Sequence, residues 1–166
     1  YSDRISDLKK RITDKAKDAV TSVNLLSNQI SAINAKLLAS GVSGQGSNAL
    51  FDQRDVLIDQ LSKVCQISVG YGSKGEAEIR LGNTGSGPII VEANASPSKG
   101  SNTTTAVDVI TQGARLQPVV GLGKVATNQI QAGIISGLVD SYALADDTLK
   151  EIDNLAFILS KKFNEV

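Results

Sequence analysis

The sequence has no histidine, no tryptophan, no methionine and a single cysteine, Cys65. Catalytic triads need a histidine, and zinc sites are built almost entirely from cysteine and histidine, so both kinds of site are excluded. One cysteine cannot form an intrachain disulfide. Cys65 continues an apolar helix face, so we expect a buried, inert side chain rather than a reactive thiol. We therefore predict no catalytic residue, no metal site and no cofactor.

Aromatic residues make up only 4% of the chain, and lysine plus arginine balance aspartate plus glutamate at 17 each. An interior poor in aromatics must use leucine, isoleucine, valine and alanine, which suits packed helix faces better than an enclosed pocket. Nucleic-acid affinity rests largely on neutralising phosphates, so a net charge of zero argues against that partner. The apolar runs are far shorter than the roughly 18 residues of a membrane span, so we expect no membrane partner.

The first long element is predicted over residues 3–40, which contain no proline or glycine. At 1.5 Å per residue, a helix of this length spans roughly 55 Å. The polar side chains of its second half are mostly amides and hydroxyls, which favours a surface covered by other subunits, although a solvated face is the alternative. Its apolar residues recur at steps of three or four, with one irregular step, and form one face: Ile5, Leu8, Ile12, Ala16, Ala19, Val23, Leu26, Ile30, Ile33 and Leu37.

A second, shorter helix is predicted over residues 48–65, after a glycine-rich turn at 41–46. That turn lacks the Gly-Lys-Ser/Thr ending of a phosphate-binding loop, so we interpret it as a plain connection between helices. Asn48 is the expected N-cap, because its side-chain oxygen can accept from the unpaired N–H groups of the first turn. Asp52 and Asp55 then lie near the positive end of the helix dipole.

Arg54 falls within the apolar face of this short helix, between Leu50 and Leu57. A guanidinium on an apolar face needs a carboxylate or carbonyl partner, because an unpaired buried charge is costly. Asp55 is adjacent in sequence and should point away, so we expect the partner to come from another helix. The alternative is that the arginine extends its charged end to solvent.

The middle of the chain changes to a period of two, which predicts strands separated by turns. The polar segment 94–105 is expected to be a mobile loop. The candidate strands, which would form a short antiparallel meander or hairpin and its neighbours, are 66–69, 77–81, 89–92, 106–110 and 115–117.

A last helix is indicated by a pattern that begins near Ile134. Asp146 and Asp147 are placed where a helix would start or restart, because carboxylates favour the N-terminal end. Beyond them the apolar residues repeat at three and four: Leu149, Ile152, Ala156, Leu159 and Phe163.

These pieces predict an α+β fold that is mainly α: an elongated antiparallel helical bundle of two long helices and one short, with a small antiparallel β insertion. We expect residues 1–66 and 129–166 to form the helical core and 67–128 to form the β-rich insertion. The two long helices should grip the short one. The chain begins at Tyr1 without a methionine or a signal-like segment, which is typical of a piece of a longer protein.

Four patches, in order and at matching spacing, resemble the family of the first flagellar hook-associated protein. The most specific is 48–55, Asn-Ala-Leu-Phe-Asp-Gln-Arg-Asp, which is similar to the family's N-D-L-L-D-Q-R-D segment. Residues 26–34 resemble its long helix, 131–140 its G-G-x-L-G-G-L-L-D segment, and 153–164 its closing helix. The chain departs from the family pattern at Ala132, Ile135 and Tyr142, and residues 70–128 carry no recognised match.

The resemblance implies a structural subunit that joins the hook to the filament of the bacterial flagellum. It also implies export as an unfolded chain, an extracellular location, and as partners the hook protein and neighbouring junction subunits. The chain would be the D1-like core without its terminal coiled-coil segments, and therefore monomeric. The expected structural and interface residues are Asn48, Asp52, Gln53, Arg54 and Asp55, which would lock the short helix to the long one.

Two other functions are open at this level. Helical faces of this kind also occur in adhesin-like or signalling interaction modules. The other alternative is an enzyme, which would have to use pairs of carboxylates as acid and base. The candidate pairs are Asp52/Asp55, Asp146/Asp147 and Glu151/Asp153. Helix capping, the helix dipole or surface exposure already explains each pair, and none has the spacing of a Mg²⁺- or Ca²⁺-binding loop.

Overall fold

The computed structural model describes residues 1–39, 45–93 and 104–165. It confirms a mainly helical α+β fold with two small antiparallel sheets. In chain order the elements are α1 (Ser2–Ala39), α2 (Gln45–Val64), β1 (Ile67–Tyr71), β2 (Ala77–Leu81), β3 (Ile89–Val91), β4 (Val107–Gln112), β5 (Arg115–Val120), β6 (Val125–Ala126) and α3 (Ile134–Asn164).

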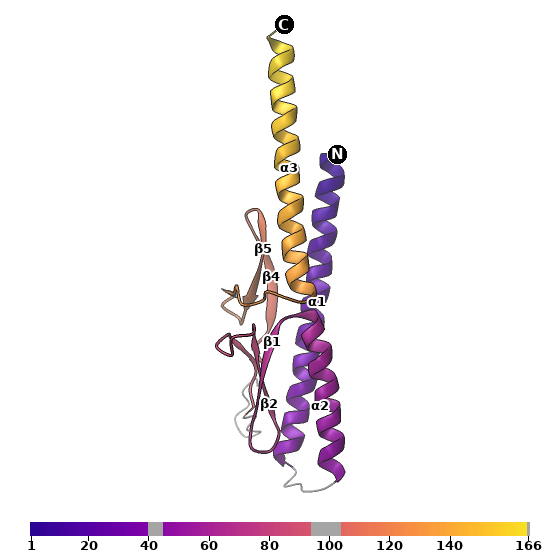
Figure 1. Ribbon diagram of the computed structural model, residues 1–166, viewed down its shortest axis with the longest axis vertical. Coiled ribbons are helices and arrows are strands. Elements are labelled where there is room, and N and C mark those ends of the chain that lie inside the picture. The colour runs from indigo at the N-terminus through magenta and orange to yellow at the C-terminus, as the bar shows by residue number, and fades with distance from the viewer. Residues whose placement is uncertain (40–44, 94–103, 166) are drawn as a thin grey trace.

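Helix α1 is the axis of an elongated molecule, and the other two helices pack against it one after the other (Figure 1). Helix α2 runs antiparallel to the C-terminal half of α1, while α3 runs antiparallel to its N-terminal half and extends well beyond its start. The expectation that two long helices grip α2 is therefore wrong. Because α1 has 38 residues and α2 only 20, α1 has room for two partners placed end to end.

The two partner helices meet at a tight joint. The Gln66 amide donates to the Ala132 carbonyl at 3.1 Å, and Gly133 forms the N-cap of α3 with φ +91°. A Cβ at Gly133 would lie 2.9 Å from both the Cys65 Cα and the Val64 carbonyl oxygen. Glycine is thus required here for its backbone conformation and for space. The whole β-rich segment leaves and returns at this joint.

One hydrophobic cluster links the helices to both sheets. The predicted apolar face of α1 supplies much of it, from Ile12 through Val23 to Ile30. Leu61 of α2 and Cys65, directly after that helix, are also fully buried. The sheets add the inward side chains of alternating positions, such as Ile79 and Leu81 in β2. The periodicity therefore identified most of the interior correctly.

The strands form two antiparallel sheets, with orders β1-β2-β3 and β4-β5-β6. Strand β2 pairs with β1 in regular register and with β3 across an irregularity at Ile79/Arg80. Strand β6, in a stretch with no clear pattern, was not predicted, and most of the expected mobile loop, residues 94–103, lies outside the described residues. An isolated bridge between Val91 and Thr104 connects the two sheets.

Two helix boundaries differ from the sequence-based expectation. Helix α2 begins at Gln45, so Asn48 lies inside its first turn and is exposed instead of capping it. Helix α3 is continuous through residues 140–147, so Asp146 and Asp147 are internal positions and mark no helix start. A carboxylate near a predicted helix start is weak evidence for that start, because carboxylates also occur inside helices. In α3 the Asp146 carboxylate forms an ion pair with Lys9 of α1.

Candidate functional site

Arg54, the centre of the most specific sequence patch, lies where α2 meets the turn between β1 and β2. Its guanidinium binds the Asp55 carboxylate through Nε and Nη2 at 2.9 and 2.8 Å, and its Nη1 donates to the Gly75 carbonyl. The guanidinium carbon lies 4.9 Å from the Phe51 ring centre and 4.5 Å from that of Tyr71, within cation–π range. Only 11% of the Arg54 side chain is exposed.

Arg54 binds a carboxylate and a carbonyl, as expected, but the expectations that Asp55 points away and that the partner lies on another helix are wrong. Adjacent residues point about 100° apart on a helix, but the long arginine side chain bends back to reach Asp55. Among the described residues, no second helix takes part, and the carbonyl comes from the turn between β1 and β2. Gly75 has φ +82°, and a Cβ there would lie 2.3 Å from the Phe51 ring, so the turn must carry glycine. The cluster fastens sheet β1-β2-β3 to α2.

The other predicted residues of this patch face outward. Asn48, Asp52, Gln53 and Asp55 are exposed, and the structure does not bring them together into one binding site. Two of them lie along a shallow groove of about 520 Å³ between α1 and α2. The groove is lined by Gln29, Ala32, Ile33, Lys36, Asp52, Gln53, Val56 and Leu57.

Two asparagines of α1, which sequence reasoning did not single out as anchors, hold the sheets. The Asn34 amide donates to the Ala77 carbonyl and its oxygen accepts from the Ala77 amide, both at 2.8 Å. Asn24 makes the same pair of bonds with Val107, both at 2.9 Å. An asparagine side chain presents an N–H donor beside a carbonyl acceptor, so it can replace a neighbouring strand's backbone.

The chain's own sheets therefore cover part of the amide-rich half of α1, at Asn24 and Asn34, whereas Asn28 and Gln29 are exposed. For the exposed amides, cover by other subunits or by water stays a prediction. The sequence did contain a signal for contacts between the amides of α1 and strands, namely a run of amides on a helix followed by strand-forming segments. What the sequence could not provide was which amide meets which strand, because that depends on the register between α1 and both sheets.

A charged contact joins α1 to α3. Lys9 donates to Asp146 at 2.5 Å, and Lys150 binds the same carboxylate at 2.9 Å. The hydrogen bond from Lys9, followed by that from Lys150, lowers the pKa of Asp146, and the same contact raises the pKa of Lys9. Lys9 also lies 4.9 Å from the Tyr142 ring centre. The pair fixes the antiparallel register of the two helices.

The projecting half of α3 exposes an apolar stripe. Beyond the end of α1, Leu155 is 58% exposed and Phe163 80%, and Ile158 and Leu159 are about half exposed. Large apolar patches on a soluble surface mark interaction sites. We call Leu155, Ile158, Leu159 and Phe163 the α3 stripe.

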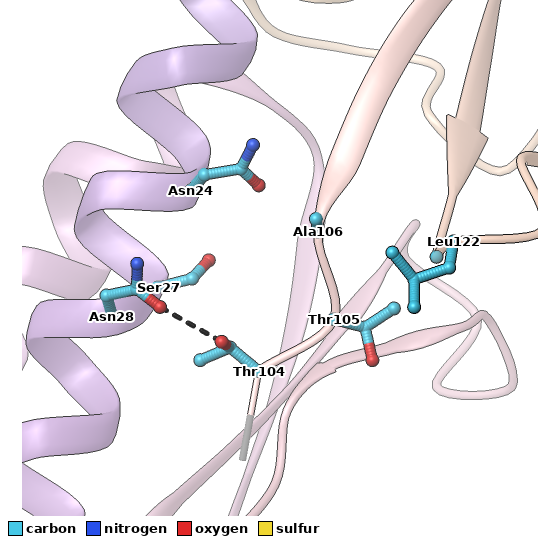
Figure 2. A pocket seen from close by; sticks show the side chains of 8 residues that line it. Asn24, Ser27, Asn28, Thr104, Thr105, Ala106 and Leu122 are labelled. Carbon is cyan, nitrogen blue, oxygen red and sulfur yellow. Dashed lines mark hydrogen bonds between the residues drawn. The ribbon is translucent and has the colours of Figure 1, made fainter. Parts of the chain in front are cut away.

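A pocket of about 530 Å³ lies between α1 and the second sheet (Figure 2). Thr104 donates to the Asn28 side-chain oxygen at 2.9 Å across it. None of its lining residues is ionisable, so the lining offers no general acid or base. They are Asn24, Ser27, Asn28, Thr104, Thr105, Ala106, Gly121 and Leu122.

Three of the groups that could carry other chemistry make structural contacts or are buried. Burial raises the pKa of the Cys65 thiol to about 12, so it is an inert core residue, as expected. Asp55 and Asp146, one from each of two candidate carboxylate pairs, bind Arg54 and Lys9. Within the described ranges, no three metal-ligating side chains converge. No helix in the described part of the chain has the length and apolarity needed to cross a bilayer.

The fold and surface define a class: a rod of antiparallel helices that carries small sheets on one flank and an uncovered apolar helix face at one end. Comparison with known proteins specifies the family. The whole chain, residues 1–166, matches the family described as "Flagellar hook-associated protein FlgK helical domain". The chain therefore belongs to this family, whose members are components of the extracellular flagellum.

Two relatives agree with this assignment. Flagellar hook-associated protein 1 of Bacillus subtilis (strain 168) is 25% identical over 187 aligned residues, which cover 99% of this chain and 36% of the relative. A solved structure, the flagellar hook junction protein FlgK from Burkholderia pseudomallei, shares the fold with a TM-score of 0.64 at 19% identity. That likeness covers 83% of this chain and 24% of the other. The chain thus spans about a third or less of the relatives it matches.

Proposed function

We propose that this chain is a structural part of a subunit that joins the flagellar hook to the filament, and that it acts through subunit packing. Its partners would be the hook protein and neighbouring junction subunits. The observation that carries the proposal is the α3 stripe, an apolar helix face left uncovered by the described chain in a member of a flagellar hook-associated family. Family membership favours this role over an unrelated adhesin-like or signalling module.

The mechanism we propose is mechanical. Helix α1 supplies a rod of 38 residues, and separate contacts fasten the other elements to it. Asn24 and Asn34 hold the sheets, and Lys9 holds α3. Such a rod can transmit load between neighbours without rearranging internally, because packed interiors resist compression.

We propose different roles for the two parts of the chain that meet at Gln66 and Ala132. We propose residues 1–66 and 129–166 as the helical core that packs with neighbours, and 67–128 as a β-rich insertion. The bond between Gln66 and Ala132 supports this division, because it closes the ends of the insertion against each other. Within the core, Arg54 and Asp55 secure α2 to the insertion, and Asn48, Asp52 and Gln53 are offered to neighbouring subunits.

The test is made in the bacterium that encodes the chain. Deleting the gene should leave hooks without filaments in electron micrographs, and the native gene should restore filaments. Restoration should fail with the double substitution Leu155→Asp and Leu159→Asp in the α3 stripe. The matched control is Asn164→Asp, which adds a charge to the same exposed turns on a face away from the stripe. Normal filaments in the deletion strain would refute the proposal.

A further inference from the structure

We draw no further inference here: the strongest candidate, the shallow groove between α1 and α2 with Ile33, Val56 and Leu57 in its lining, is an open apolar face, and nothing in the described part of the structure shows what covers it.

Discussion

The two ends of α1 show how similar helical patterns acquire different roles. Around Ile30 and Leu37, α2 covers one side of α1 and the sheets cover another, so that both residues are buried. Before Ile12, the same helix has no fully buried side chain and runs beside α3 (Figure 1). The first end is an interior, whereas the second leads into a surface that α3 extends. Whether a helix face becomes part of the core therefore depends on whether strands pack against it, more than on its helical spacing.

The largest difference between the ends should appear in paired truncations. Leu61, fully buried in α2, should lose about 3 kcal/mol of unfolding free energy on change to alanine, through lost burial and a residual cavity. Leu155, on the α3 stripe, should lose less than about 0.5 kcal/mol by the same change. Urea unfolding of the two variants beside the wild type measures both losses. Similar losses would mean that the stripe is covered within the single chain.

The next effect concerns the polar attachment of the sheets. Asn34→Leu should cost about 2 kcal/mol, because it leaves the buried amide and carbonyl of Ala77 without their partners. Asn28→Leu, at an exposed position that binds only Thr104 among the described contacts, should cost at most about 1 kcal/mol. Chemical denaturation of both variants makes the comparison. Equal costs would show that the amide pair with β2 is not an anchor.

The substitution Arg54→Ala measures how strongly the Arg54 contacts stabilise the attachment of the first sheet to α2. A fully buried ion pair would lose a few kcal/mol on this change. Because the partner carboxylate of Asp55 is 57% exposed, we now expect about 1–2 kcal/mol, mainly from the Gly75 carbonyl and the two rings. Thermal melts give the size, and faster amide exchange in the 72–76 turn should accompany it. A loss above about 4 kcal/mol would restore the buried-pair interpretation.

The smallest expected effect is a pH dependence at the α3 end. The Lys9 and Lys150 contacts lower the pKa of Asp146, so the stability from this group is present above the unfolded pKa, about 3.9, and is lost as the pH falls through the folded value. Asp146→Asn should therefore lower the melting temperature at pH 7 and approach the wild type near pH 2.5. Asp14→Asn, which breaks the exposed Lys10–Asp14 pair, is the control. A constant difference between wild type and Asp146→Asn would rule out this linkage.

The sequence by itself determined the local elements and the family. Spacing of three and four specified α1 and most of α3. Alternation specified β2 and β3 in full and parts of β1, β4 and β5, and the 48–55 patch pointed to flagellar hook-associated proteins. These properties depend on residues close together in the chain, so they can be recognised without knowing the fold. The missed β6, only two residues long, is too short to show a period.

Tertiary structure alone decided which elements meet. It placed α2 and α3 end to end on α1, paired Asn24 and Asn34 with particular strands, and gave Arg54 a turn carbonyl in place of a second helix. It also left the last turns of α3 uncovered. The physical reason is that helical periodicity predicts which face of a helix will be buried. Which element covers that face depends on helix lengths and on register across distant parts of the chain.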